Sequence, residues 1–231
     1  MGRITGGPQG MIRGVLFDMD GILLDSERLG RSIFQQACRE RGYEVDNDRY
    51  AQLLGVTRAN CSRLLKEQLG EAFPYDEVYE IYREGLRTHA LDGTLPVKKG
   101  LQACMDGLKA RGIRIALATS TPRQQVELYQ QHIPAMKDAF DFMVCGGEAR
   151  SKPDPDIYLK AAQGLGLTAR ECAGVEDSLA GIQSISAAGC VRVMIPDLLP
   201  CDGRFEGLTD YCLESLEDLC PLVDEINQQG K

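Results

Sequence analysis

Two aspartates with the potential for chemistry follow a short apolar run, in Val15-Leu16-Phe17-Asp18-Met19-Asp20-Gly21-Ile22-Leu23-Leu24-Asp25. The run predicts a buried parallel strand, and open α/β sheets bind ligands in the crevice at the carboxyl ends of such strands. Because side chains alternate along an extended chain, Asp18 and Asp20 would point to the same side.

Two carboxylates this close repel each other unless a cation or a shared proton compensates, which favours a hard metal such as Mg²⁺ with Asp18 and Asp20 among its ligands. The alternative is a solvated acidic turn. The full pattern D-x-D-G-x-L-x-D is far more specific than an isolated D-x-D after a strand, and we therefore favour a chemical role.

A hydroxyl cluster, Thr119-Ser120-Thr121-Pro122, follows a second apolar run at 113–118. We expect Thr121 to cap the next helix, with Pro122 as its first residue. Thr119 and Ser120 would then lie beside free backbone N–H groups at a positive helix end, which suits phosphate binding. A capping turn without further function is the alternative.

A lysine, Lys152, precedes another predicted helix in Ser151-Lys152-Pro153-Asp154-Pro155. Pro153 biases Lys152 toward an extended backbone, and Asp154 with Pro155 is typical of a helix start. A lysine held there would reach a bound phosphate and Asp18. Most lysines are solvated surface residues, which is the simpler interpretation.

Two acidic residues, Glu176 and Asp177, follow the predicted strand 172–175. Asp177 is well placed as a further metal ligand, and Glu176 would either bind the metal or orient a ligand. Alternatively, Asp177 only caps the next helix.

The elements that position these clusters follow two patterns. Residues 26–93 show helical spacing without a clear strand, and from Pro96 to Gly100 onward helices alternate with short strands. We predict an α/β fold with a doubly wound, Rossmann-like parallel sheet and right-handed crossovers. The expected domains are a disordered leader at 1–10, a catalytic core of 11–25 and 94–231, and a helical cap of 26–93.

The composition of the chain excludes several classes of binding partner. The formal charge is −8, and the nine cysteines form no C-x-x-C pair. We therefore expect no nucleic-acid partner, no disulfide or zinc site, and a monomer in the reducing cytoplasm. The sequence has no apolar run of membrane-spanning length and no signal-peptide pattern, so we expect no membrane association.

Together, the four clusters resemble the motifs of the haloacid dehalogenase superfamily, in the same order and over residues 11–227. Lys152 begins a close match to the third motif, K-P-x-P-x-x-Y. The resemblance implies that Asp18 is a nucleophile forming a phosphoaspartate, that Asp20 is the general acid and base, and that Thr119 supplies the second motif's hydroxyl. Because a carboxylate and a phosphate repel, Mg²⁺ and Lys152 would have to neutralise the site.

The predicted helical insertion resembles the mobile C1 cap of the subgroup containing beta-phosphoglucomutase and many small-molecule phosphatases. Such a cap would exclude water and select the leaving group. The loop Gly55-Val56-Thr57-Arg58 resembles the specificity loop of these caps, in which Arg58 would hold a distal anionic or hydroxyl group. A surface arginine is the alternative.

Three functions remain open: a phosphatase of small phosphorylated metabolites such as sugar phosphates, a sugar-phosphate mutase, and a non-catalytic binding domain. The intact set Asp18, Asp20, Thr119, Lys152 and Asp177 counts against the last. Family mutases carry a histidine early in the first cap helix, where this chain has Gly30. We therefore favour the phosphatase.

Overall fold

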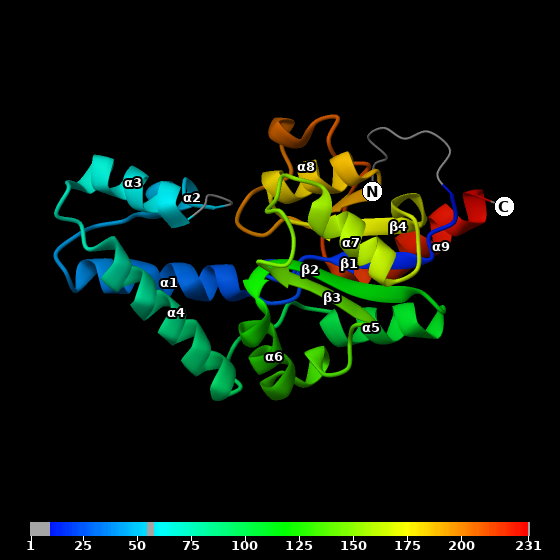
Figure 1. Ribbon diagram of the computed structural model, residues 1–231, viewed down its shortest axis with the longest axis horizontal. Helices are drawn as coiled ribbons and strands as arrows, with labels where there is room; N and C mark the ends of the chain where they lie inside the picture. Colours follow the sequence, from blue (N-terminus) through cyan, green and yellow to red (C-terminus); the bar gives the residue numbers. More distant parts are fainter. Residues whose placement is uncertain (1–9, 55–57, 231) are drawn as a thin grey trace.

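The computed structural model describes residues 10–54 and 58–230, and Figure 1 shows a layered core with a helical lobe beside it. In this part of the chain the core sheet has six strands, all parallel, in the order β3-β2-β1-β4-β5-β6. The strands are β1 (Gly14–Phe17), β2 (Arg114–Pro122), β3 (Phe142–Gly146), β4 (Cys172–Glu176), β5 (Val191–Met194) and β6 (Tyr211–Cys212). The predicted doubly wound parallel sheet is confirmed, and β6 is an addition that the sequence pattern did not reveal.

Strand β1 lies in the middle of the sheet, between β2 and β4. Phe17 pairs with Leu117 on one side and with Val175 on the other, so β1 and β4 end together while β2 runs on through Pro122. Val15 and Phe17 pack into the apolar cluster on one face, and Leu16 packs into the cluster on the other. This alternation explains why the run is apolar throughout: a central strand of a parallel sheet is covered on both sides.

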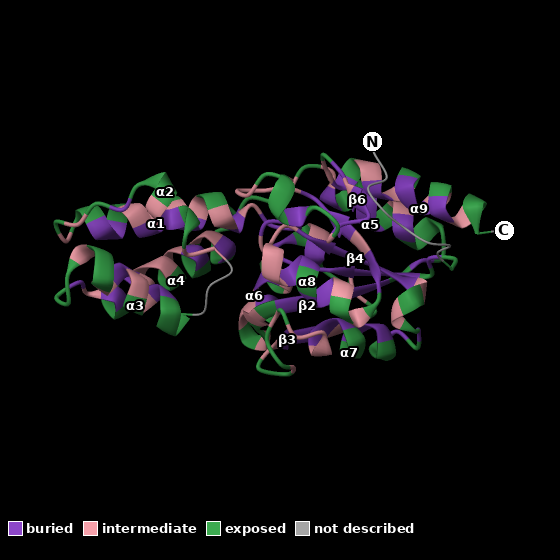
Figure 2. Ribbon diagram, turned by 90° about the horizontal axis from the view of Figure 1, so that it is seen from above, coloured by how far each residue is buried: buried purple, intermediate pink, exposed green. Residues whose placement is uncertain are grey.

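Helices cover both faces of the sheet, and Figure 2 shows the buried strands between them. Residues of α5 (Leu101–Ala110), α6 (Arg123–His132) and α9 (Leu219–Gln229) belong to the cluster around Phe17. Residues of α7 (Asp156–Gly164) and α8 (Leu179–Ala188) belong to the cluster around Leu16. Among the described residues, no helix is both long and apolar enough to cross a membrane.

The helical lobe, here called the cap, contains α1 (Ser26–Arg39), α2 (Asn47–Ala51), α3 (Arg58–Leu69) and α4 (Tyr75–Leu91). These four helices fall within the predicted segment 26–93 and share an apolar cluster of their own, separate from the two core clusters. The predicted leader, apart from Gly10, lies outside the described residues, as do residues 55–57 of the predicted specificity loop.

The two connections between cap and core run side by side. The Asp25 N–H donates to the Pro96 carbonyl, and the Lys98 N–H donates to the Leu23 carbonyl. The Lys98 ammonium also contacts the buried carboxylate of Asp197, at 2.8 Å, in the loop after β5. Arg28, in the first turn of α1, reaches the same carboxylate at 3.1 Å. These ion pairs fix both connections to one loop of the core.

Candidate active site

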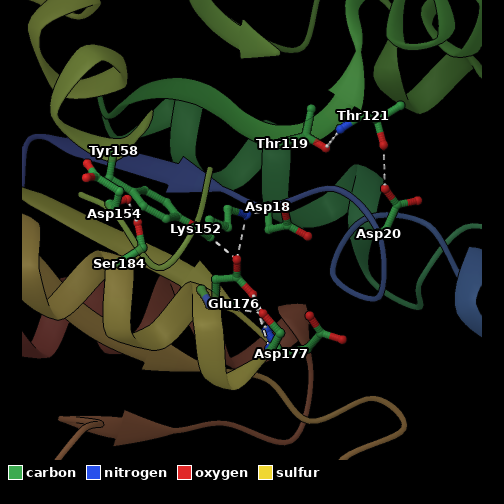
Figure 3. Close-up of polar contacts among 12 residues, drawn as sticks. Asp18, Asp20, Thr119, Thr121, Lys152, Asp154, Tyr158, Glu176, Asp177 and Ser184 are labelled. Carbon is green, nitrogen blue, oxygen red and sulfur yellow. Dashed lines mark hydrogen bonds and ion pairs between the residues drawn. The ribbon is translucent and has the colours of Figure 1, made fainter. Parts of the chain in front are cut away.

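The predicted polar clusters meet at the carboxyl edge of the sheet, where β3, β2, β1 and β4 end (Figure 3). Their side chains line a cavity of about 460 Å³ between core and cap. Its lining includes every predicted site residue: Asp18, Asp20, Arg58, Thr119, Ser120, Lys152, Glu176 and Asp177. Strand order therefore assembles in space what the sequence separates by more than 150 residues.

The buried ammonium of Lys152 joins two carboxylates. Its Nζ lies 2.5 Å from Asp18 Oδ1 and 2.6 Å from Glu176 Oε1. Burial would lower the pKa of Lys152, but the two carboxylates outweigh it and raise the pKa above its usual value. Lysine thus remains a cation beside Asp18. Burial raises the pKa of Asp18 to about 7, even though Lys152 acts to lower it.

Glu176 is the most heavily hydrogen-bonded carboxylate of the site. Oε1 accepts from Lys152 and from the Tyr158 hydroxyl at 3.0 Å, while Oε2 accepts from the Ser178 hydroxyl at 3.0 Å and from the N–H groups of Asp177 and Ser178. Burial opposes ionisation, but Lys152 and Ser178 outweigh it and hold the pKa of Glu176 below its usual value. A Cβ on Gly181 would lie 1.9 Å from this carboxyl group, so the glycine makes room for it. These contacts suit a group that orients Lys152.

Asp177 has the opposite surroundings. Within residues 10–54 and 58–230 its carboxylate has no hydrogen bond or ion pair, and Ser178, rather than Asp177, caps α8. Ligand oxygens of Asp18, Glu176 and Asp177 all lie within 4.8 Å of one another. Burial, followed by the charges of Glu176 and Asp18, raises the pKa of Asp177 well above its usual value. Uncompensated carboxylate repulsion of this kind fits a hard cation such as Mg²⁺.

The Asp20 carboxylate stands apart from these three and is held by two hydroxyls. Ser26 Oγ donates to Oδ1 at 2.6 Å, and Thr121 Oγ1 donates to Oδ2 at 2.8 Å. The prediction that Thr121 caps the following helix was wrong: Pro122 occupies the cap position of α6, and no side chain caps that helix. Strand β2 continues through Pro122, which keeps Thr121 extended and turns its hydroxyl toward Asp20.

We expect Thr121→Val to lower kcat/KM about tenfold, because valine keeps the shape of threonine but leaves one oxygen of Asp20 without its donor. The measurement is steady-state hydrolysis of p-nitrophenyl phosphate. Thr88→Val, at an exposed position of α4, is the matched control and should behave like the wild type. Equal activity of the Thr121 variant and the control would show that the hydroxyl does not position Asp20.

The three remaining predicted residues, Thr119, Ser120 and Arg58, differ in burial and in their contacts. Thr119 is buried, and its hydroxyl accepts the Thr121 N–H at 3.1 Å, whereas Ser120 is exposed to the cavity. Arg58 begins α3, and its guanidinium pairs with Asp76 at 2.8 Å and lies 4.1 Å from the centre of the Tyr79 ring. Arg58 therefore faces the cavity while being paired within the cap.

Sequence reasoning missed the contacts that orient the carboxylates, those of Tyr158, Ser26 and Thr121. The final tyrosine of the K-P-x-P-x-x-Y match is Tyr158, so the motif contained that signal. No comparable signal in the sequence pointed to the bonds from Ser26 and Thr121 to Asp20.

Comparison with known proteins agrees with this geometry. Residues 15–195 match the family model of haloacid dehalogenase-like hydrolases. The chain is 28% identical to a putative phosphatase, YhcW, of Bacillus subtilis, over 95% of this chain and 100% of that protein. It is also 28% identical to a phosphorylated carbohydrates phosphatase of Thermotoga maritima, over 78% of this chain and 82% of the relative.

Among solved structures, CbbY of Rhodobacter sphaeroides, a mutant in complex with xylulose-(1,5)bisphosphate, superimposes with a TM-score of 0.76. The two sequences are 28% identical, and the match covers 90% of this chain and 96% of that one. The family match covers strands β1 to β5 apart from Gly14, the cap and all four motif clusters. The chain belongs to the haloacid dehalogenase-like hydrolases.

Proposed function

We propose that this protein is a Mg²⁺-dependent phosphatase of small phosphomonoesters, including phosphorylated sugars, and that it acts through a phosphoaspartate on Asp18. The observation that carries the proposal is the buried Asp18-Lys152-Glu176 bridge beside the unpaired carboxylate of Asp177. Relatives named as phosphatases, and a structural neighbour holding a sugar bisphosphate, support the same substrate class.

The proposed chemistry divides among the chain's own residues. Asp18 attacks phosphorus, and the phosphorus–oxygen bond to the leaving alcohol breaks. Lys152, Thr119 and Ser120 hold the phosphoryl oxygens. Mg²⁺, held by Asp18 and Asp177, would supply the positive charge that offsets the carboxylates and the phosphate.

Asp20 serves both halves of the reaction. It donates a proton to the leaving oxygen in the first half, and in the second it accepts a proton from the water that attacks the phosphoaspartate. Its two hydroxyl donors, Ser26 and Thr121, fix the carboxyl group for these transfers. The enzyme then returns to its starting state with Asp18 free and inorganic phosphate released.

The surroundings of Gly30 favour a phosphatase over a mutase. A Cβ built on Gly30 would lie 2.6 Å from Cε2 of Tyr82, so the tyrosine ring fills the space that a histidine would need. The absence of the mutase-type histidine is thus built into the packing of α1 against α4. Neighbours titled putative beta-phosphoglucomutase or beta-phosphoglucomutase are 24% or 21% identical, and these likenesses establish the shared fold alone.

One experiment tests both the intermediate and its fate. With Mg²⁺ and p-nitrophenyl phosphate, Asp20→Asn should accumulate phosphoenzyme, because the acidic leaving group needs little protonation while hydrolysis has lost its base. Intact-protein mass spectrometry after a rapid acid quench detects the adduct. The wild type should release inorganic phosphate from hexose phosphates, and EDTA should stop the release.

Two controls complete the test. Asp106→Asn, on the exposed side of α5, should turn over normally and accumulate no adduct. Chromatography of the hexose-phosphate reaction decides between the two enzyme types: interconversion of phosphate positions that outpaces phosphate release would establish the mutase and refute the phosphatase.

A further inference from the structure

A second cavity, of about 220 Å³, lies within the cap and adjoins the active-site cavity. The two cavities share four lining residues, Glu27, Leu54, Arg58 and Tyr79. The two cavities therefore lie side by side, and the same four side chains border both. We call this second cavity the ring pocket, and aromatic side chains dominate its walls: Phe34, Tyr50, Tyr75, Tyr79 and Tyr82.

One wall of the ring pocket is a row of tyrosines on a single face of α4. Tyr75, Tyr79 and Tyr82 are spaced by four and three residues, and their successive ring centres are 5.9 Å apart with planes inclined by 17° and 28°. Phe34 of α1 meets Tyr50 edge to face, with ring centres 5.7 Å apart. Aromatic walls with a few polar groups are typical of sites that bind flat rings.

Three polar groups of the ring pocket, on Glu27, Tyr50 and Tyr82, lack protein partners in the described part of the chain. Among the described residues, the half-buried carboxyl of Glu27 makes no hydrogen bond or ion pair, and neither do the hydroxyls of Tyr50 and Tyr82. These three groups line the pocket without a protein partner in residues 10–54 and 58–230, so they are available to hydrogen-bond to a ligand. Burial, with the charges of Asp20 and Asp197, raises the pKa of Glu27 to about 8.

We infer that the ring pocket binds a planar heterocycle carried by the leaving alcohol, so that the preferred substrates are phosphomonoesters of ring-bearing alcohols, such as nucleoside monophosphates. Glu27, at the junction of the two cavities, hydrogen-bonds to the leaving group. The ring packs against the aromatic wall beside the Arg58 guanidinium, which lies 4.1 Å from the centre of the Tyr79 ring. The volume suffices, since a cavity of ~150 Å³ holds benzene. A simple sugar phosphate leaves this space unfilled. The inference rests on the proposed phosphatase activity and narrows its substrates.

A matched substrate set tests the inference. Uridine 5′-monophosphate and ribose 5-phosphate share the phosphorylated carbon and the sugar and differ in the base. We expect kcat/KM to be about 10–100-fold higher for the nucleotide, the range expected when one base stacks on aromatic side chains. Pyridoxine 5′-phosphate extends the set to a heterocycle without a sugar, and whichever ring-bearing ester is faster identifies the source of the ring.

Variants locate the effect in the ring pocket. Tyr79→Leu and Glu27→Gln should each reduce the ratio between ring-bearing and ring-free substrates. Tyr43→Leu is the matched control, because Tyr43 packs in the same cap cluster but does not line the pocket, and its ratio should equal that of the wild type. Tyr50→Phe, which removes only a hydroxyl, guards against misfolding of the leucine variant.

The outcomes are distinct. Ribose 5-phosphate hydrolysed as well as both ring-bearing esters, or a ratio unchanged in all three pocket variants, would overturn the ring pocket as a substrate site. No phosphate release from any of the esters, including p-nitrophenyl phosphate with Mg²⁺, would instead refute the proposed phosphatase activity.

Discussion

Asp18→Asn should lower kcat at least about 10⁴-fold while leaving the fold intact, a loss on the scale seen when a nucleophile is removed from a covalent mechanism. An amide cannot attack phosphorus as a carboxylate does, and it is a weaker ligand for a hard cation. In this variant the Lys152 ammonium still has the Glu176 carboxylate as a partner, at 2.6 Å. The buried positive charge therefore remains paired, and we expect the fold to persist. Phosphate release in single-turnover and steady-state assays measures the effect.

Two checks make this result decisive. Mass spectrometry must show that asparagine has not deamidated back to aspartate, and Asp92→Asn, an exposed change in the turn after α4, should retain full activity. Turnover above a small fraction of the wild-type rate in a clean Asp18→Asn preparation would contradict the nucleophile assignment. Phosphoenzyme should also be undetectable in this variant.

Lys152→Met should lower kcat/KM about 10²–10³-fold, comparable to the loss of one strong donor that stabilises transition-state charge. The acid limb of the pH profile should also move. Lys152 acts to lower the pKa of Asp18 while burial raises it. Removing the ammonium therefore raises that pKa, and the carboxylate becomes available only at higher pH. The loss should be greatest at low pH and shrink as the pH rises.

Stability gives an independent measurement for the same variant. Without the ammonium, Asp18 and Glu176 are left as neighbouring buried carboxylates, and breaking a buried ion pair costs about 3–5 kcal/mol. Thermal unfolding should therefore begin at a lower temperature near neutral pH. Lys99→Met, which removes an exposed lysine paired with Glu217, should change neither the profile nor the stability appreciably. If the acid limb of the pH profile were unchanged in Lys152→Met, Lys152 would not control the ionisation of Asp18.

Sequence patterns predicted the strands and helices whose formation depends on neighbouring residues or on a regular spacing of apolar residues. An apolar run flanked by polar residues identifies β1, and helical spacing with terminal glycines identifies the elements around it. The clusters at Asp18, Thr119, Lys152 and Glu176 could be expected to meet because parallel strands end at one edge of a sheet. The two-residue strand β6 was missed because it is too short to show a period of two.

Contacts between cap and core could not be predicted in the same way. That Tyr82 fills the space beside Gly30 depends on how α1 packs against α4, and the ring pocket depends on the four cap helices facing one another. Thr121 shows the limit most clearly: its local sequence is typical of a helix cap, yet the continuation of β2 gives its hydroxyl to Asp20. Tertiary packing overrides a local preference that is small in energy.

The central place of β1 has a consequence for synthesis on the ribosome. Its partners, β2 and β4, begin at Arg114 and Cys172, and at ordinary translation rates β4 emerges roughly 8–30 s after β1. During that interval the most apolar segment of the motif, with at least one open edge, belongs to an incomplete chain. Meanwhile the cap has been synthesised in full, and its helices contact one another locally. We therefore expect the cap to fold before β1 is paired on both sides and Asp18 reaches its final position. Until then, β1 is the segment that a chaperone would most need to protect.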